Sequence, residues 1–486
     1  MRSERGQKML NSKVDEDSAL IGQAIRNVLA HNPHGSGNLY DAITLGVFAI
    51  FMKYMNDNSK KFDMEIPDIL KYDILLALMS DNFPHYQLEE FLNELQFRMG
   101  IEGDFRLYDE LEHCGLRDNN ELVYTLFHSI ENCSFDRDYG ERLALTAAEH
   151  LLDMIPWIKT NDYTPMAPVI TQLLNRISDI QPNMRCYGFS QDSCVTLSVL
   201  ASGHDCFVTV QNNSKDKALF MMFLLMGCSP KKVRLLNHRF GWMPIGTKQD
   251  MGSYDRAYTL TTFNRQLRMQ EVFELSRGVG DAYIQNWPEQ LGCGEWLEVR
   301  HMICALNKDG IGYAVLPMGA MTRLATYESV REELLKKNVI DAVIEFPSGI
   351  FNYTGVKTAL VVIKKNRDRK SVLMVNLDGT EGKKLLKILK SSRTVFEADM
   401  VADIVLKRQE QKGVSREISI DDILGNESSL SPSAYISEEI NIEELGEAMD
   451  DLMQRELELN EQFDEIASDY KKAIQAFMTM RDTWQH

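Results

Sequence analysis

Between residues 160 and 375 the sequence alternates short apolar runs of strand length with longer runs of helical periodicity. This alternation is typical of βαβ units and predicts an α/β domain with a mainly parallel sheet. The expected helices are Lys217–Met226 and Glu328–Lys337, and the expected strands are Cys206–Val210, Ile311–Leu316, Val339–Glu345, Thr358–Lys364 and Val372–Asn376. Only a loop separates the strands at 339–345 and 358–364, which leaves open an antiparallel part of the sheet.

The regions on either side of this alternation have a different character. Residues 1–158 carry apolar residues at i, i+3 and i+4 spacing with prolines between the periodic stretches, which predicts a helical N-terminal domain. Residues 377–440 are mixed and polar. We therefore predict four regions: the helical domain (1–158), the α/β domain (159–376), a mixed connecting region (377–440) and a long C-terminal helix (441–486).

The C-terminal helix carries a narrow apolar seam with strict 4-3 spacing, about 54 Å long at ~1.5 Å per residue. Residues 438–469 hold thirteen acidic residues and one basic residue, Arg455. The seam could pack along its own domain or pair with a partner's helices in a coiled coil. We favour the partner, because so long a seam has more to bury than one small domain covers. The expected partner-binding residues are Leu445, Met449, Leu452, Leu459, Phe463, Ile466, Tyr470 and Phe477.

Composition and charge exclude several classes of protein. The 486 residues are 44% hydrophobic, as in globular proteins, and 53 basic against 71 acidic residues give a net charge of −18. So acidic a chain should not hold nucleic acid through its overall field. We expect a cytoplasmic protein, because no apolar run spans a bilayer and the N-terminus lacks a secretory signal. The eight cysteines form no C-x-x-C pair and the histidines no H-E-x-x-H, so we expect no metal site.

Five short motifs occur in a fixed order through the α/β region. Taken together they resemble the modification (M) subunit of type I restriction-modification systems, which are N6-adenine DNA methyltransferases. The resemblance implies a Rossmann-like class I methyltransferase fold that binds S-adenosylmethionine, with a helical N-terminal domain and a long C-terminal helix. The motifs are Asn161–Pro165 (family G-E-x-Y-T-P), Val315–Gly319 (V-L-P-x-G), Arg331–Leu334 (I-R-x-x-L), Phe346–Phe351 (L-P-x-x-x-F) and Thr354–Thr358 (T-G-I-x-T).

The positions that bind the cofactor in this family carry other residues here. The family writes Asp-Pro-Ala-Cys-Gly-Thr/Ser-Gly-Gly, whereas this chain reads Tyr187, Gly188, Phe189, Ser190, Gln191, Asp192, Ser193 and Cys194. Cβ atoms in place of the glycines would crowd a turn that must approach the ligand closely. The acidic residue expected after the next strand is Asn212, which lacks the charge. We therefore expect no bound cofactor.

The catalytic motif is altered as well. The family's Phe-Asp-x-x-x-x-Asn-Pro-Pro-Phe motif holds a flipped adenine. The exocyclic amine of that base donates hydrogen bonds to the Asn side chain and to the carbonyl between the prolines, whose fixed φ orients this carbonyl. This chain keeps the lead-in acid Asp255 and the aromatic Phe263. The Asn has become Leu260, and the prolines have become Thr261 and Thr262. Leucine offers no acceptor to the amine.

Three hypotheses follow. The first is a catalytically inactive methyltransferase-like subunit of a restriction-modification or phage-defence complex, whose partners are a specificity-type subunit, an active methyltransferase subunit or both, and which meets DNA only through the complex. The second is an active but divergent N6-adenine DNA methyltransferase that uses S-adenosylmethionine. The third is a nucleic-acid-binding module without chemistry. Basic clusters at 364–370 and 231–234 could contact the phosphates of DNA. Such clusters more commonly lie at a solvated hairpin tip.

Overall fold

The computed structural model contains two compact units, Met1–Ile436 and Ser437–His486, and each is treated by itself. In the first unit the structure describes residues 4–31, 39–62, 64–79, 83–98, 106–152, 154, 166–189, 193–211, 217–236, 251–263, 294–324, 326–351, 355–388 and 394–436. In the second it describes short helical stretches at 452–456, 458–459, 462–463, 466–468, 470–472 and 474.

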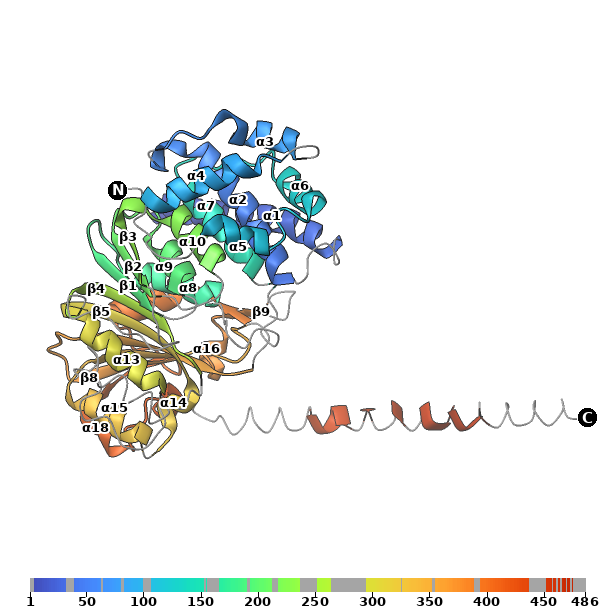
Figure 1. Ribbon diagram of the computed structural model, residues 1–486. Coiled ribbons are helices and arrows are strands. Elements are labelled where there is room, and N and C mark those ends of the chain that lie inside the picture. The colour runs from blue at the N-terminus through green and yellow to red at the C-terminus, as the bar shows by residue number, and fades with distance from the viewer. Residues whose placement is uncertain are drawn as a thin grey trace, which may run out of the picture. The chain divides into compact units, whose positions relative to one another are not determined.

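A central sheet organises the first unit (Figure 1). Its described strands follow the order β11-β8-β6-β7-β5-β4-β1-β2-β3. Neighbours from β5 to β3 are parallel, as are β6 and β8, whereas β7 and β11 run antiparallel to their neighbours. The strands are β1 (Arg185–Phe189), β2 (Phe207–Gln211), β3 (Val233–Leu236), β4 (Tyr254–Leu260), β5 (Leu306–Pro317), β6 (Ile340–Glu345), β7 (Thr358–Lys364), β8 (Ser371–Asn376) and β11 (Ser415–Ser419).

This topology confirms the expected α/β fold class with a mostly parallel sheet. The β6 and β7 strands, joined by a loop, are antiparallel neighbours. Strands β6 and β7 are buried on both faces, which explains their nearly continuous apolar sequences. The chain order reverses between β1 and β4, as in other doubly wound sheets.

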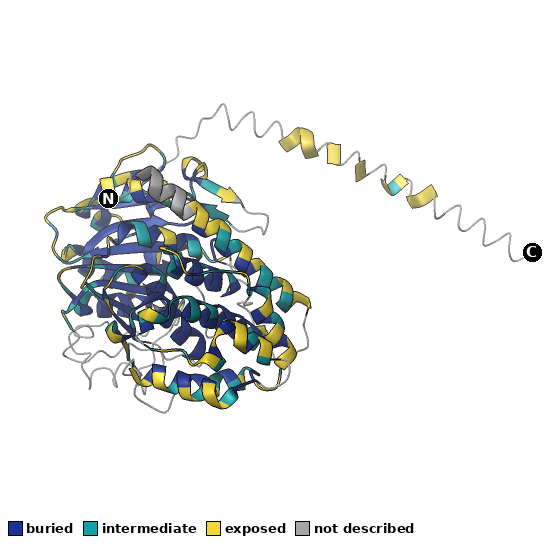
Figure 2. Cartoon of the chain, turned by 90° about the horizontal axis from the view of Figure 1, so that it is seen from above, coloured by how far each residue is buried: buried dark blue, intermediate teal, exposed yellow. Residues whose placement is uncertain are grey.

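Helices cover both faces of the sheet and form two separate cores. Figure 2 shows the buried sheet between helices whose outer sides are exposed. One face carries α8 (Pro168–Ile177), α9 (Ser193–Ala201), α10 (Lys217–Gly227) and α17 (Ala398–Lys407). The other carries α13 (Gly294–Ala305), α14 (Met318–Thr322), α15 (Thr326–Lys336) and α18 (Ile420–Gly425). Because side chains alternate along a strand, Cys186 of β1 enters the first core and Tyr187 the second.

The N-terminal part is helical, as its apolar periodicity predicts. Its helices are α1 (Glu4–His31), α2 (Leu39–Asp57), α3 (Tyr72–Leu78), α4 (His85–Arg98), α5 (Leu107–His113), α6 (Asn120–Ser129) and α7 (Gly140–Leu152), with short 3-10 turns η1 (Ser59–Phe62) and η2 (Asp68–Leu70). The ammonium of Lys61 donates to the carbonyl of Met226 at 2.8 Å, which ties this part to α10. The expected boundary at residue 158 lies outside the described residues, so the four-region division stays a prediction.

The stretch after β8 completes the sheet. It begins with α16 (Thr380–Lys383) and a small antiparallel pair, β9 (Leu386–Ile388) and β10 (Thr394–Phe396). After α17, strand β11 pairs with β8 at the edge of the main sheet. Two further 3-10 turns are η3 (Pro230–Lys232) and η4 (Pro432–Ala434). Among the described helices, none is both long and apolar enough to cross a membrane.

Candidate functional site at the carboxyl edge of the sheet

Doubly wound sheets bind ligands beyond the carboxyl ends of their parallel strands, where the strand order reverses. In this chain that place lies between β1 and β4, and we call this edge of the sheet the carboxyl edge. The residues that end the strands there are Phe189 of β1, Gln211 of β2 and Leu260 of β4. The altered motif positions of the sequence fall on the same three strand ends.

An aromatic cluster fills the α13 side of β1. The ring of Tyr187 stacks on Tyr254 with centroids 4.7 Å apart, and Phe189 meets the ring of His301 edge-on at 4.9 Å. The Tyr187 hydroxyl donates to Gln211 Oε1 at 2.9 Å and lies 3.0 Å from His301 Nε2. Both side chains on β1 are buried. The described ends of β1 and β2 therefore carry aromatic rings and an amide where the family places carboxylates.

The glycine-turn substitutions can be located only in part. Tyr187, Gly188 and Phe189 belong to strand β1, so the strand continues past the point where the motif predicted the turn to begin. Ser193 opens α9. The remaining expected cofactor positions, Ser190, Gln191, Asp192 and Asn212, lie outside the described residues.

The turn after β4 has an arrangement that the family's two prolines could not make. The side chain of Leu260 is buried in the first core. The amide and the hydroxyl of Thr261 both donate to the carbonyl of Val315 at 3.0 Å, which continues the β4–β5 pairing by one residue. The amide of Thr262 donates to Glu298 Oε1 at 3.3 Å. Proline has no N–H, so both backbone bonds depend on the threonines.

The other two catalytic-motif positions lie in different places. Phe263 follows the turn, is half-buried, and meets the ring of Phe351 edge-on at 6.2 Å. Asp255 lies near the start of β4, about 16 Å from Leu260 at ~3.3 Å per residue. Its carboxylate accepts bonds from the Arg185 amide at 2.7 Å and from the Asn307 side chain at 2.8 Å. The structure thus brings positions 260–263 together and leaves Asp255 at the opposite edge.

Glu298 on α13 is a site residue that the sequence did not single out. Its side chain reaches the turn after β4, where Thr259 Oγ1 lies 3.4 Å from Oε2 and the Thr262 amide donates to Oε1. Burial raises the pKa of this carboxyl to about 8, against the bond from Thr262, and nearby Glu295 raises it further. Glu298 is therefore uncharged at neutral pH. In the sequence Glu298 looks like an ordinary surface glutamate, because nothing in the run Gly294–Ala305 indicates that its side chain is buried.

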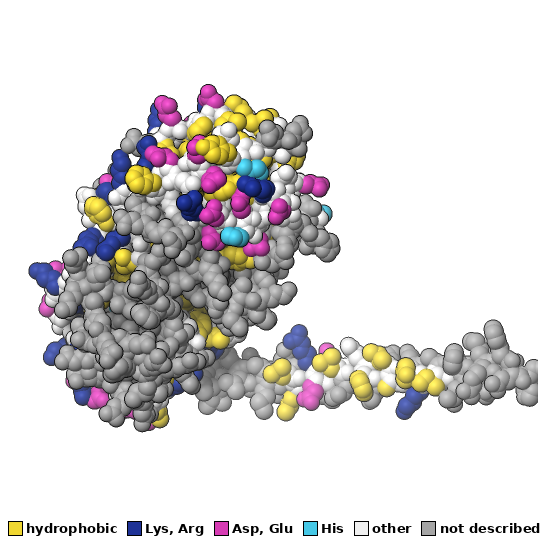
Figure 3. Space-filling view, in the orientation of Figure 1, with side chains coloured by type: hydrophobic (Ala, Val, Ile, Leu, Met, Phe, Trp, Pro, Cys, Tyr) yellow, Lys and Arg dark blue, Asp and Glu magenta, His cyan; other side chains and the backbone are white. Residues whose placement is uncertain are grey.

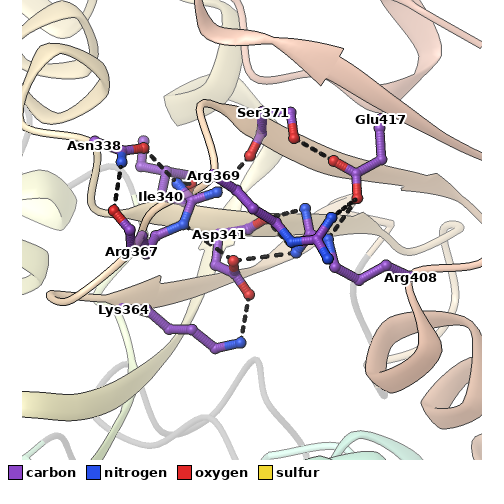
Figure 4. A network of polar contacts seen from close by, with 9 residues as sticks. All are labelled: Asn338, Ile340, Asp341, Lys364, Arg367, Arg369, Ser371, Arg408 and Glu417. Atoms are coloured by element: carbon purple, nitrogen blue, oxygen red, sulfur yellow. Dashed lines mark hydrogen bonds and ion pairs between the residues drawn. The ribbon is translucent and has the colours of Figure 1, made fainter.

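The first part of the basic cluster at 364–370 forms ion pairs inside the protein, whereas residues 368–370 are exposed (Figure 4). Asp341, at the start of β6, pairs with Lys364 at 2.8 Å and with Arg408 at 3.1 Å. Arg367 Nε also lies 3.1 Å from Asp341, as an ion pair without hydrogen-bond geometry. The Arg367 side chain is only 3% exposed, so it is no part of a solvated hairpin tip. Arg408 also binds Glu417 of β11, which fastens the edge strand.

A groove among the described residues lies elsewhere. It has a volume of about 850 Å³ and lies in the helical part, beside α2 and α3. Lys53 and Lys71 line it together with Asp57, Asp68 and Tyr72. Each lysine forms an ion pair with one of these aspartates, so the positive charges along the groove are balanced by negative ones. Within the described part of the chain, no group of three or more His, Cys, Asp or Glu side chains is placed to hold a metal ion.

Comparison with known proteins agrees with the topology. Residues 281–444 match the family model described as N-6 DNA Methylase. The type I restriction enzyme MpnII methylase subunit of Mycoplasma pneumoniae is 25% identical over 179 residues, which are 36% of this chain and 32% of that protein. The chain is thus similar to type I methylase subunits over this stretch. The matched stretch spans about a third of that relative, so activity and partners remain matters of proposal.

Solved structures of methylase subunits share the fold over most of the chain. The type I restriction-modification methyltransferase subunit from Streptococcus thermophilus has a TM-score of 0.65 at 16% identity, covering 85% of this chain and 98% of that one. A chain from work on complex assembly and conformational transition of the type I R-M system has a TM-score of 0.58 at 15% identity, covering 92% and 97%. At such identities the likeness shows the fold alone.

Proposed function

We propose that this chain is a methylase-like subunit that does not transfer methyl groups and that serves as a structural component of a restriction-modification or phage-defence complex. The turn after β4 carries the proposal. The family uses an asparagine there to accept a hydrogen bond from the target amine, and here Leu260 is buried among apolar side chains. The donor groups of Thr261 and Thr262 are committed to Val315 and Glu298.

The described cofactor positions support the same proposal. S-adenosylmethionine, the family's methyl donor, is held partly by carboxylates at the ends of the first two strands. In this chain β1 ends in Phe189 and β2 in Gln211, and Gln211 bonds to the Tyr187 hydroxyl. These described residues do not fit the methyl donor.

The second part of the proposal concerns partner subunits. Five seam residues of the second unit lie in its described stretches, and each is 64–70% exposed: Leu452, Leu459, Phe463, Ile466 and Tyr470. Met453 and Ile474 widen this apolar stripe and are also exposed. Figure 3 shows apolar side chains along the described part of this unit. An apolar stripe of this width is best covered by partner helices. Leu445, Met449 and Phe477 lie outside the described residues.

The proposed partners are a specificity-type subunit, an active methyltransferase subunit or both, with DNA bound through the complex. On the face drawn in Figure 3, acidic and basic side chains are interspersed over the helical part, without a basic patch among the coloured residues. The net charge of −18 also disfavours DNA binding by the chain alone. The helix at 441–486 is the proposed contact.

Deletion of residues 441–486 tests this contact. We expect the truncated chain to keep its fold, because the first compact unit ends at Ile436, and to lose co-purification with a specificity-type subunit. A triple variant, Leu459→Ser, Phe463→Ser and Ile466→Ser, should have the same effect without shortening the chain. A control variant at a position outside the 4-3 seam of the sequence, Glu461→Ser, should bind normally. Assembly that survives both the deletion and the triple variant would refute the proposal.

An active, divergent N6-adenine DNA methyltransferase is the second candidate. One observation favours it: Phe263 is kept at the turn, and its ring meets Phe351. Under this alternative the purified chain would methylate DNA with S-adenosylmethionine, and Phe263→Ala would abolish the activity. Absence of transfer by the wild-type chain within its complex would rule this candidate out.

A further inference from the structure

The guanidinium of Arg331, on α15, is fully buried and bonds to backbone carbonyls of separate segments. Its Nε atom donates to the carbonyl of Ser428 at 2.8 Å, and Nη2 donates to that of Glu427 at 3.3 Å. Its Nη1 atom donates to the carbonyls of Arg323 at 2.7 Å and Ala320 at 3.2 Å. Because the guanidinium presents its donors in a rigid fork, one side chain joins α14, α15 and the turn at 427–428.

That turn has an unusual backbone. Helix α18 ends at Gly425, and the next turn places Glu427 at φ 53° and Ser428 at φ 50°. L-residues rarely adopt this left-handed conformation. Such conformations persist where surrounding contacts determine them. Arg331 binds the carbonyls of both residues and supplies those contacts.

The turn and the residues that follow it form hydrogen bonds to groups at the carboxyl edge of the sheet. We call residues 427–436 the exit segment. The amide of Leu430 donates to the carbonyl of Met321 in α14 at 3.0 Å, and the Leu430 side chain is fully buried. The amide of Ser433 donates to Glu345 Oε2, at the end of β6, at 3.1 Å. The first compact unit ends at Ile436, and the unit that holds the partner-binding helix begins at the next residue.

We propose that Arg331 is a positioning residue for partner assembly, because it fixes the exit segment from which the C-terminal helix departs. This inference rests on the proposed function, since it requires that helix to bind the helices of a partner. An exit segment that is already ordered loses less conformational entropy when the partner docks. Loss of the anchor should therefore weaken binding although no interface residue has changed.

Hydrogen exchange of the full chain tests the anchor itself. Arg331→Met should speed exchange of the amides in residues 427–436 about tenfold, with the core strands unchanged. The matched control is Arg256→Met, which removes another buried arginine that donates to two carbonyls, those of Ser178 and Asp255, at the opposite edge. Arg331→Lys keeps the charge but loses the fork, so it should show the same local increase if the methionine variant does not fold. Unchanged exchange in the exit segment of a folded variant would overturn the anchoring role.

Partner affinity tests the positioning role. The probe is a specificity-type subunit whose central helices are intact. We expect Arg331→Met or Arg331→Lys to bind it about 5- to 10-fold more weakly than the wild type, and Arg256→Met to bind it equally well. Equal affinity of the wild type and the Arg331 variants would overturn the positioning role. No binding by the wild type would instead refute the proposed function, while the exchange experiment would still report on the anchor.

Discussion

The two edges of the central sheet use charge in opposite ways. At the amino edge, where the parallel strands begin, buried ionic groups are paired. Asp341 faces Lys364, Arg367 and Arg408, and Glu417 binds Arg408. The Arg408 guanidinium holds the pKa of Glu417 below its ordinary value, so this carboxyl stays ionised.

At the carboxyl ends of β1, β2 and β4 the described groups are mostly uncharged. Tyr187 and Gln211 bond to each other, Leu260 is in the core, and Glu298 is protonated at neutral pH. A binding site for a charged cofactor needs the reverse, with ionised groups directed outward at this edge. The chain thus keeps a network of ion pairs where β6, β7 and β11 are held together, and it carries apolar or neutral groups at the described ends of β1, β2 and β4.

The largest expected effect concerns the amino edge. Asp341→Ala leaves the buried Arg367 guanidinium without its carboxylate and removes a partner from Lys364 and Arg408, so it should lower the free energy of unfolding by about 3–5 kcal/mol. Urea denaturation measures it. The control Asp403→Ala removes half of an exposed pair with Lys407 and should change stability by no more than about 0.5 kcal/mol. Similar losses in the two variants would contradict the contrast between buried and exposed charge.

The next prediction restores the family's residue at the carboxyl edge. Leu260→Asn buries an amide among apolar side chains and should destabilise the chain by about 2–4 kcal/mol. Leu260→Met, which conserves volume, should cost less than about 1.5 kcal/mol. Neither variant should transfer methyl groups to DNA, because the threonines still shape the turn. Methyl transfer by the Leu260→Asn variant would contradict this, because it would show that restoring the asparagine is enough to restore catalysis.

A further prediction concerns the pH dependence of stability at the carboxyl edge, where the expected change per pH unit is smaller than either of these losses. The pKa of Glu298 is raised from an ordinary 4.5 to about 8, so the unfolded chain releases its proton first as the pH rises. The carboxyl therefore contributes stability that is complete below pH 4.5 and falls by about 1.4 kcal/mol per pH unit until pH 8. Glu298→Gln does not titrate and should remove this slope. Parallel stability–pH curves for wild type and variant would contradict the assignment.

The sequence predicted strands that are apolar on both faces, such as β7. It did not predict β4, whose polar side chains bond to residues far away in the sequence. The run at 358–364 matches β7 in both bounds, because burial on two faces leaves an unbroken apolar sequence. Strand β4 carries Asp255 and Arg256, so it did not look like a strand. Asp255 bonds to Arg185, 70 residues away, and Arg256 to Ser178, 78 residues away. No local pattern reports such partners.

For the candidate site, the sequence predicted which residues lie together but not the hydrogen bonds that hold them. Motif order placed Leu260, Thr261, Thr262 and Phe263 on one turn, and the structure brings them together. The bonds that hold the turn could not be predicted, because Glu298 comes from a helix 36 residues later. Arg367 looked solvated for the same reason, since its carboxylate partner Asp341 lies on another strand.

Whether the cofactor site is lost can be measured by isothermal titration calorimetry of S-adenosylmethionine binding to the purified chain, beside an active family member. We expect no heat of binding up to about 1 mM ligand, whereas the active relative should bind in the micromolar range. Micromolar binding by this chain would contradict this expectation, because a carboxyl edge with the described aromatic and amide groups would then still hold the methyl donor.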